Sequence, residues 1–257
     1  MKNRKKSDGP RKAPSPSGAS ERLYGVHAVS AALANPKRHV STIFATRNGL
    51  ARLTGFIETH SATVTEISPA ELTRKLGRDA VHQGVMAEGK PLLQPTLEEV
   101  LPTVTRDRPL VVLDQVTDPH NVGAILRSAA AFDATAVVMT RRNSPPLDGV
   151  VAKAASGAVE HIPVVLVANL ARALEDIGKA AIQRLGLDSS ATQAIEKVEI
   201  TTPYALALGA EHKGLRRLTR EKCDLMCRIT TPGPLASMNV SNAAAVAMHT
   251  LSQQAKT

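Results

Sequence analysis

The sequence is poor in aromatic residues. Its 257 residues include three phenylalanines, two tyrosines and no tryptophan. Proteins that bind single-stranded nucleic acids commonly stack the bases on aromatic rings. Because this chain has too few rings for such a platform, any RNA that it binds must be held by charge, shape and hydrogen bonds.

Cysteines and long apolar runs are scarce as well. Cys223 and Cys227 are the only cysteines, and a CxxxC pair without a second pair or nearby histidines is a poor zinc site. We therefore expect two reduced, packed thiols and no metal site. No apolar run approaches the ~18 residues of a membrane span, and no apolar stretch follows the basic N-terminus as in a secretory signal. These features predict a cytoplasmic protein without a membrane partner.

Glycine-rich phosphate loops are also absent. No GxGxxG follows a predicted strand, and the sequence contains no GxxxxGK[ST]. Enzymes that bind dinucleotides or nucleoside triphosphates on α/β sheets hold the phosphates with these loops. An α/β enzyme that depends on such a nucleotide is therefore unsupported.

The positive charge is concentrated at the N-terminus. The formal net charge is +9, and residues 1–20 alone carry six lysines and arginines against one acid, a net +5. This stretch is rich in Pro, Ser and Gly and has almost nothing apolar to bury, which predicts a disordered basic tail. Such a tail suits a polyanion, whose counterions it would release. The same composition fits a solubilising tail without a partner.

Hydrophobic periodicity predicts a small α/β domain over residues 21–90, with order beginning near Leu23. Helices are expected at 26–33, at 48–60 and from Pro69, and strands at 40–45, 62–67 and 82–87. Ser68 and Glu71 have the spacing of a capping box that starts the third helix. Several prolines mark residues 91–108 as a linker.

Residues 109–257 have the pattern of a parallel sheet. Apolar strands are expected at 110–113, 136–139, 163–167, 182–187, 204–208 and 226–229, with helices at 122–132, 149–156, 169–177 and 240–252. Strands that are apolar throughout are typical of sheets covered on both faces. Ligands of such sheets bind beyond the carboxyl ends of the strands. Polar residues that follow the strands are therefore candidate ligand contacts.

Three strand ends carry unusual polar residues. After the first strand, Asn121 opens a helix and Arg127 follows in its second turn. An amide, a helix N-terminus and a guanidinium together suit a phosphate or a ribose, although a capped helix with a solvated arginine fits the spacing equally well. After the strand at 204–208, Gly209 ends the strand and Glu211 follows it closely. Glu211 is either a ligand contact or part of an ordinary turn.

The third strand end leads through a Pro/Gly loop into an alanine-rich helix. Ser237, Asn239 and Ser241 precede or open that helix. Hydroxyl and amide groups at this position either cap the helix or contact a ligand. Capping accounts for one of the three and need not account for all of them.

In their order and spacing, these segments resemble the three motifs of the SpoU (TrmH) family of RNA ribose 2′-O-methyltransferases, in the SPOUT superfamily. The motifs are D-P-x-N-x-G…R-S, G-x-E-x-x-G and S-L-N-V-S. The matching residues are Asp118, Pro119, Asn121, Gly123, Arg127, Ser128, Gly209, Glu211, Gly214, Ser237, Asn239, Val240 and Ser241. Likeness in residues 24–29, 81–84 and 216–221 is greatest to the bacterial 23S rRNA guanosine 2′-O-methyltransferase branch.

The resemblance implies a fold, a cofactor and a set of site residues. Residues 109–257 would form an α/β domain with a C-terminal trefoil knot, and residues 21–90 a ribosomal-protein-like RNA-binding domain, in a homodimer whose site is completed near the subunit interface. S-adenosyl-L-methionine would be held largely by backbone groups of Gly209, Ile229 and Met238. The implied catalytic and ribose-binding residues are Asn121, Arg127, Glu211, Ser237 and Asn239.

The implied reaction moves a methyl group from S-adenosyl-L-methionine to a ribose 2′-hydroxyl, in a guanosine of 23S rRNA. Because a free guanidinium has a pKa above about 12, we expect Arg127 to bind the phosphate beside the target ribose rather than to act as the base. Asn121 and Glu211 would orient Arg127 and the ribose. A tRNA ribose methyltransferase and a catalytically silent rRNA-binding protein of the same fold remain alternatives.

Overall fold

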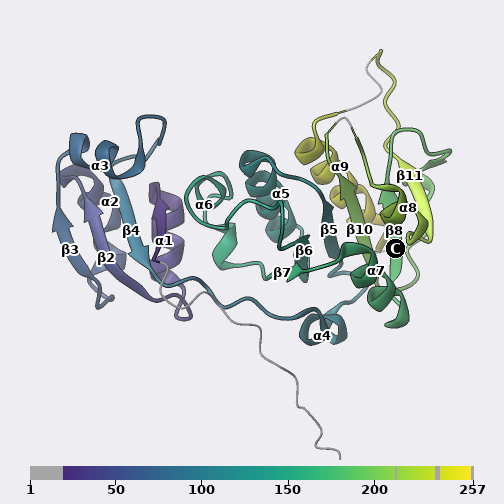
Figure 1. The fold of residues 1–257 in the computed structure, drawn as a ribbon, viewed down its shortest axis with the longest axis horizontal. Coiled ribbons are helices and arrows are strands. Elements are labelled where there is room, and N and C mark those ends of the chain that lie inside the picture. Colours follow the sequence, from purple (N-terminus) through teal and green to yellow (C-terminus); the bar gives the residue numbers. More distant parts are fainter. Residues whose placement is uncertain (1–19, 212, 235–237, 256–257) are drawn as a thin grey trace, which may run out of the picture.

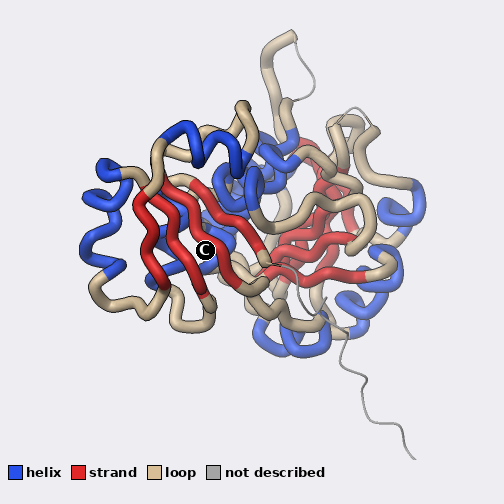
Figure 2. The backbone as a smooth tube through the Cα atoms, turned by 60° about the vertical axis from the view of Figure 1, so that its left-hand side comes forward, coloured by secondary structure: helices blue, strands red, loops and turns tan. Residues whose placement is uncertain are grey.

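The computed structural model describes residues 20–211, 213–234 and 238–255. Two α/β units lie side by side along the long axis (Figure 1). The smaller contains a four-stranded sheet of order β1-β4-β2-β3, and the larger a seven-stranded sheet of order β7-β6-β5-β10-β8-β11-β9. Figure 2 shows the two sheets, with the smaller one nearer the viewer. The predicted basic tail, except for its last residue, lies outside the described residues.

The smaller unit alternates strands and helices, as its periodicity predicts. Its elements are β1 (Glu21–Tyr24), α1 (Val26–Ala34), β2 (Val40–Ala45), α2 (Arg47–Ile57), β3 (Thr63–Glu66), α3 (Pro69–Leu76) and β4 (Val85–Gly89). Strand β2 pairs with β3 in parallel, whereas β4 pairs antiparallel with both β1 and β2. The capping box of Ser68 and Glu71 is confirmed at the start of α3.

The first strand, β1, starts at Glu21, close to Leu23, where order was expected to begin, and it pairs with β4 over its whole length. One expectation for this unit is wrong. The last strand starts at Val85 rather than at residue 82. Gln83 and Gly84 have φ angles of 55° and 82°, and a left-handed backbone cannot continue a strand.

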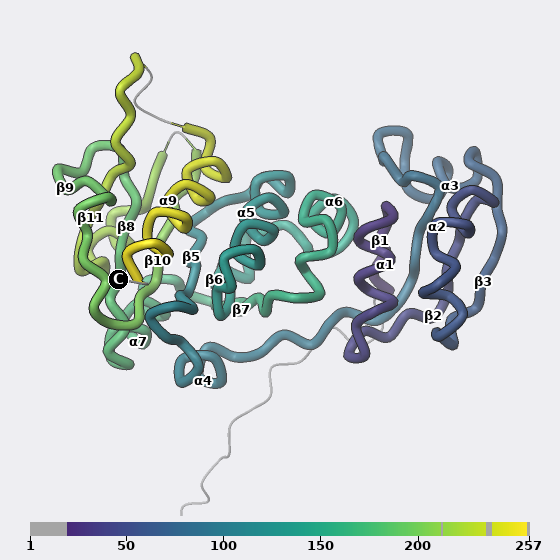
Figure 3. Tube along the Cα trace, turned by 180° about the vertical axis from the view of Figure 1, so that it is seen from behind, coloured from purple at the N-terminus to yellow at the C-terminus, as the bar shows by residue number. Residues whose placement is uncertain are grey.

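The segment expected to be a plain linker, residues 91–108, contains helical structure. It holds α4 (Leu97–Val100) and the 3₁₀ helix η1 (Leu101–Thr103). Thr96 and Glu99 form a second capping box, and Val100 and Val104 are buried against the large sheet. Figures 1 and 3 show this segment running along the outside of the molecule to α4.

The larger unit is a parallel α/β sheet, as predicted. Every strand pairing in it is parallel. Its elements are β5 (Leu110–Asp114), α5 (Pro119–Ala131), β6 (Ala136–Thr140), α6 (Gly149–Ala154), η2 (Ala158–Glu160), β7 (Val164–Val167), α7 (Leu170–Lys179), β8 (Gln183–Leu187), β9 (Gln193–Ala194), η3 (Ile195–Lys197), β10 (Tyr204–Gly209), α8 (Arg217–Glu221), β11 (Leu225–Arg228) and α9 (Val240–Ala255). The short elements β9, η3 and α8 were not expected, and α5 begins earlier than expected because Asp118 caps it.

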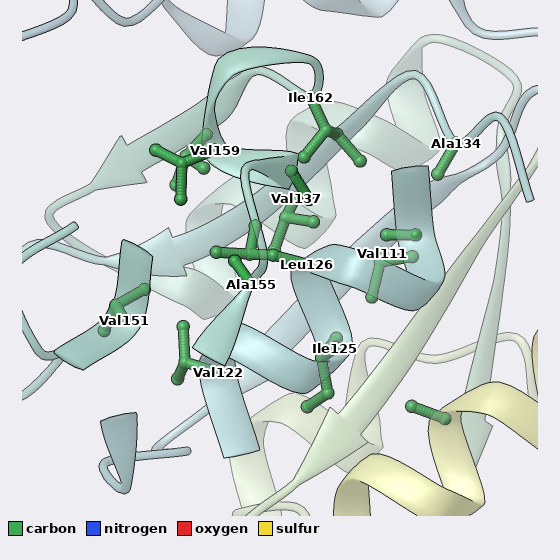
Figure 4. Close-up of a cluster of buried hydrophobic side chains, with 14 of the residues drawn as sticks. Val111, Val122, Ile125, Leu126, Ala134, Val137, Val151, Ala155, Val159 and Ile162 are labelled. Atoms are coloured by element: carbon green, nitrogen blue, oxygen red, sulfur yellow. The ribbon is translucent and has the colours of Figure 1, made fainter. Parts of the chain in front are cut away.

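The large sheet buries apolar side chains on both faces. Val111 and Leu113 of β5 face a core that includes α5 and α9, whereas Leu110 and Val112 face a core that includes α7. Figure 4 shows part of the first core, where Val111 lies near Ile125 of α5. This alternation along one strand confirms that the sheet is covered on both faces.

The two cysteines are packed free thiols, as expected. Cys227 is buried and Cys223 is half-buried. Burial raises the pKa of Cys223 to about 11 and that of Cys227 to about 12. Both groups are therefore protonated at neutral pH.

Among the described helices, none combines the length and apolar character needed to cross a bilayer.

A buried ion-pair cluster joins the two units. Arg38 donates to Glu160 of η2 and to Glu21 of β1, each at 2.6 Å, and its side chain is 2% exposed. Asn35 donates to the second carboxylate oxygen of Glu160 at 2.8 Å. Because the apolar core also continues from the small unit into the large one, the two units pack directly against each other.

Candidate active site

Asn121, Glu211 and Asn239 come from three distant segments and form one hydrogen-bonded group. Asn121 lies in the first turn of α5 and is 6% exposed. Its Nδ2 donates to Glu211 Oε1 at 3.0 Å. Asn239 Nδ2 donates to Asn121 Oδ1 at 3.0 Å and to the same Glu211 oxygen at 2.5 Å. Three of the five predicted catalytic residues are thus brought together.

Asn239 also starts the last helix. Its Oδ1 accepts hydrogen bonds from Ser241 N at 2.9 Å and Ser241 Oγ at 2.6 Å. The first of these bonds satisfies a backbone N–H at the start of α9, as a capping side chain does. The sequence left helix capping and a role in the site as alternatives for this residue. In the structure Asn239 does both. Ser237, another predicted catalytic residue, lies outside the described residues.

The loop that carries Glu211 is held by close backbone contacts. A Cβ on Gly209 would lie 2.1 Å from the carbonyl carbon of Gly214, so only glycine fits there. Gly214 has a φ of 61°, and its N–H donates to Ala210 O at 2.9 Å. The loop therefore turns back on itself and presents Glu211 beside Asn121.

Asp114 fixes the far end of that loop. It ends β5, is fully buried, and accepts from Arg216 N at 2.9 Å and from Arg216 Nε at 2.6 Å. A buried carboxylate is stable only when it is paired and hydrogen-bonded. The Asp114–Arg216 pair thus ties the segment after Glu211 to the strand that leads into α5.

A cavity of about 660 Å³ opens beside this group. It lies at the carboxyl ends of β8, β10 and β11, the position expected for a ligand of a parallel sheet. The volume falls within the range of roughly 300–1,000 Å³ for small-molecule and cofactor sites. The lining residues are Leu187, Asp188, Ser189, Leu208, Gly209, Ala210, Glu211, Lys213, Gly214, Ile229, Thr231, Met238, Asn239, Val240 and Ala243.

All three predicted cofactor residues line this cavity. Gly209 and Ile229 come from the ends of β10 and β11, and Met238 precedes α9. Gly209 has no side chain, so it contributes backbone to the cavity wall while it packs against Gly214 on its other side. The size, the position and the mixed apolar and backbone lining fit S-adenosyl-L-methionine.

Asp188 is a cavity residue that the sequence did not reveal. Its Oδ1 accepts from Ser190 N at 2.8 Å and Ser190 Oγ at 2.6 Å, and its Oδ2 is paired with Arg220 of α8. Burial of the carboxyl group favours its neutral form, but the bonds from Ser190 and the charge of Arg220 outweigh burial and hold the pKa of Asp188 below its ordinary value. The only signal for Asp188 was its place at the end of a predicted strand.

Arg127 does not join the hydrogen-bonded group. It is exposed on α5, and it makes no hydrogen bond or ion pair with any residue that the structure describes. Asn121 and Glu211 were expected to orient Arg127, but in this chain they contact each other and Asn239. The guanidinium is therefore available to a ligand or to another chain.

The geometry agrees with comparisons to known proteins. The SpoU rRNA Methylase family model matches residues 108–249. The chain belongs to this family. A second model, described as RNA 2′-O ribose methyltransferase substrate binding, matches residues 22–95 of this SpoU chain.

The SpoU chain is similar to named relatives over most of its length. It is 40% identical over 236 residues to the 23S rRNA (guanosine-2′-O-)-methyltransferase RlmB of Pseudomonas putida, covering 89% of this chain and 94% of that protein. It is 36% identical over 244 residues to RlmB of Haemophilus influenzae, covering 91% of this chain and 98% of that protein.

Solved structures share the fold. The SpoU methyltransferase AviRb of Streptomyces viridochromogenes, in complex with the cofactor AdoMet, has a TM-score of 0.77 at 23% identity, covering 91% of this chain and 89% of that one. An AdoMet-bound rRNA methyltransferase from Sinorhizobium meliloti has a TM-score of 0.76 at 19% identity, covering 91% of this chain and 87% of that one. The predicted SPOUT-type α/β class is confirmed, and the trefoil knot stays a prediction.

Proposed function

We propose that this protein transfers a methyl group from S-adenosyl-L-methionine to the ribose 2′-hydroxyl of a guanosine in 23S rRNA. The observation that carries the proposal is the Asn121–Glu211–Asn239 group at the edge of the 660 Å³ cavity. The names of relatives at 36–40% identity support the choice of rRNA and of guanosine. Because the substrate would be rRNA, we also propose that the protein acts in the cytoplasm.

When bound in the cavity, S-adenosyl-L-methionine supplies a methyl group on a sulfonium, which is a good leaving group. Gly209, Ile229 and Met238 would hold it at the ends of β10 and β11 and before α9. Glu211 and Asn239 line the same cavity. A ribose whose hydroxyl groups are bound by Glu211 and Asn239 would therefore lie next to the bound cofactor.

The polar group positions the acceptor ribose. Glu211 Oε1 already accepts two amide hydrogen bonds, whereas its Oε2 has no partner among the described residues. That second oxygen is placed to accept a hydrogen bond from a ribose hydroxyl. Because Asn121 and Asn239 fix the carboxylate, the 2′-oxygen is held in one orientation, and such positioning supplies several kcal/mol of a reaction barrier.

Arg127 would complete the site by binding the phosphate next to the target ribose. It would also stabilise the negative charge that develops on the 2′-oxygen as the hydroxyl passes its proton to solvent water. A guanidinium suits phosphate because it offers several donors in one plane. Its exposure and lack of described partners support a ligand-binding role. From the family resemblance we further propose a homodimer in which a second chain lies near this site. Ser237 would be a further residue of the catalytic and ribose-binding group.

The domain division follows the same proposal. Residues 21–90 would bind the substrate RNA, residues 91–108 would connect the domains, and residues 109–257 would form the knotted methyltransferase domain. Residues 1–20 would add non-specific attraction to the RNA backbone through their net charge of +5.

The proposal is tested by mapping 2′-O-methylation on total RNA from cells with and without the gene. The expected result is the loss of one 2′-O-methylguanosine in 23S rRNA, restored by the wild-type gene. Loss of a tRNA ribose methylation would instead indicate a tRNA enzyme. No lost methylation in any RNA, together with no binding of S-adenosyl-L-methionine to the purified protein, would indicate a silent RNA-binding protein.

A further inference from the structure

A second cavity, of about 350 Å³, lies where the small unit meets the large one. It is bordered by β1 and the end of α3 on one side, and by the start of α5 and by α6 on the other. Its volume is at the lower end of the range for small-molecule sites.

The walls of this interdomain cavity are largely apolar. Pro119, Pro145 and Pro146 contribute three rigid rings, and Leu76 and Val150 add aliphatic surface. Val150 is 38% exposed. Because the protein has few aromatic residues, a nucleobase in this cavity would pack against proline rings and aliphatic side chains instead.

Asp148 gives the cavity an unpaired carboxylate. It occupies the N-cap position of α6, yet its side chain makes no capping bond. Its carboxylate forms no hydrogen bond or ion pair with any other residue in the described part of the chain, whereas its backbone carbonyl accepts from Val151 N and Ala152 N in the usual way of a helix start. The phenol of Tyr24 lies nearby: burial, and secondarily the charge of Asp148, raise the pKa of Tyr24 above its ordinary value. Tyr24 therefore remains a neutral hydrogen-bond donor or acceptor.

Two cations border the same cavity. Arg22 Nε is paired with Glu88 at 3.1 Å, and its Nη1 donates to Lys75 O at 3.3 Å. The Lys75 ammonium lies 4.4 Å from the centroid of the Phe44 ring. Both cations are thus held in place by neighbours while they line the cavity, and they suit the phosphate backbone of an RNA strand.

The cavity is adjacent to the candidate active site. Pro119 borders it and is the first residue of α5, two residues before Asn121. At about 100° per residue, Pro119 and Asn121 point to opposite faces of the first turn. The interdomain cavity and the Asn121–Glu211–Asn239 group therefore flank the start of one helix, so an RNA strand laid across this helix end would reach both.

We propose that the interdomain cavity is a nucleobase subsite that binds a guanine of the substrate RNA, with Asp148 as its specificity-determining residue. The inference rests on the proposed function. The Watson–Crick edge of guanine presents two neighbouring donors, N1–H and the 2-amino group, which match the two oxygens of a carboxylate. Adenine presents an acceptor at N1 and is repelled. Bases in single-stranded RNA are commonly read on this edge.

The test combines Asp148→Ala with removal of the 2-amino group from the RNA. The substrate is the 23S rRNA segment that carries the mapped methylation, made with inosine in place of each guanosine in turn. With the wild-type enzyme, inosine at one position should lower kcat/KM by about ten- to a hundredfold, the usual effect of losing a hydrogen bond to a charged group. With Asp148→Ala, the same inosine should have less than about a threefold effect, because the partner is already missing.

The matched control is Asp176→Ala, which removes one carboxylate from the exposed side of α7. It should retain the full effect of inosine. Because the Asp148 side chain makes no bond within the described fold, Asp148→Ala should unfold at the wild-type temperature. The position of the sensitive inosine distinguishes the target guanosine's own base from that of a neighbour.

The outcomes separate the two claims. If the wild-type enzyme methylates the segment but every inosine has the same effect with and without Asp148, the subsite is overturned and the proposed function stands. If the wild-type enzyme methylates no rRNA segment, the proposed function fails and the subsite fails with it.

Discussion

Asn121 and Glu211 are 90 positions apart in the sequence, and a 3.0 Å hydrogen bond joins their side chains. The bond connects the first turn of α5 to the loop after β10. Asn239 binds both partners and at the same time starts α9. The three segments of the motif are therefore joined through one hydrogen-bonded group, and we expect a change in any of these side chains to alter the orientation of the others.

Replacing Asn121 with aspartate should abolish methyl transfer while leaving the cofactor bound. The substitution removes a donor and places a second carboxylate against Glu211, so the bond becomes a repulsion. Loss of one preorganised polar contact costs about 10²–10³ in rate. Because Asn121 does not line the large cavity, the Kd for S-adenosyl-L-methionine in calorimetry should change little. Asn48→Asp, on the exposed face of α2, is the control and should be fully active.

Arg127→Ala should also abolish methylation with an unchanged affinity for the cofactor. The reason differs from that for Asn121, since Arg127 is expected to bind the RNA phosphate and stabilise the alkoxide. Single-turnover rates on the rRNA segment, together with RNA binding at several salt concentrations, measure both roles. Arg172→Ala removes an equally exposed arginine from α7 and should behave as the wild type. Unimpaired turnover of Arg127→Ala would refute the assignment.

Gly209→Ala should weaken cofactor binding and destabilise the fold. The new methyl group would lie 2.1 Å from the carbonyl carbon of Gly214, so the loop has to move. Overpacking of this kind costs about 1–3 kcal/mol, measurable by denaturant unfolding. A Cβ on Gly233, by contrast, meets nothing within 4 Å, and Gly233→Ala should leave both quantities unchanged. Equal effects of the two substitutions would argue against a tight turn at Gly209.

Glu160→Ala should strongly destabilise the protein at the junction of the two units. Arg38, with a side chain only 2% exposed, would keep Glu21 but lose its most buried partner. Breaking a buried ion pair from one side costs about 3–5 kcal/mol. Adding Arg38→Met should recover much of this loss, because the uncompensated charge is then gone. Chemical unfolding measures both variants, with the exposed Glu58→Ala as the control.

Asp188 should make stability depend on pH in the acid range. Its pKa is lowered in the folded protein, so its contribution to stability is present above the unfolded carboxyl pKa of about 3.9. That contribution is lost as the pH falls through the lower folded value. The wild type should therefore lose more stability than Asp188→Asn between pH 5 and pH 2. The exposed Asp133→Asn serves as control, and parallel pH profiles for wild type and Asp188→Asn would contradict this prediction.

The sequence predicted the longer elements, and six of the eight residues predicted for the site lie in or beside the large cavity. The strands of the large sheet are apolar throughout, and the structure explains why, because the two faces of that sheet bury alternate side chains of β5 in two separate cores. The residues at the three strand ends were recognised as a set only through the resemblance to a family. Short elements such as β1, β9 and α8, of four, two and five residues, are too brief to have a clear period.

Contacts that depend on strand order were beyond sequence reasoning. Strand β10 lies between β5 and β8, and this order places Asp188 near the loop that carries Glu211. The same holds for Arg38 and Glu160, which meet because α1 packs against η2. From sequence alone a charged residue is expected to be exposed. A buried ion pair between two domains can therefore be recognised only once the structure is known.

The central claim is methyl transfer to a ribose 2′-oxygen, and one substitution in the RNA tests it most directly. Purified protein and labelled S-adenosyl-L-methionine are incubated with the 23S rRNA segment carrying guanosine or 2′-deoxyguanosine at the mapped position. The predicted result is full incorporation of label into the guanosine RNA and none into the 2′-deoxy RNA, while a 2′-deoxy substitution at a distant guanosine has no effect. Equal incorporation into both RNAs would contradict ribose methylation.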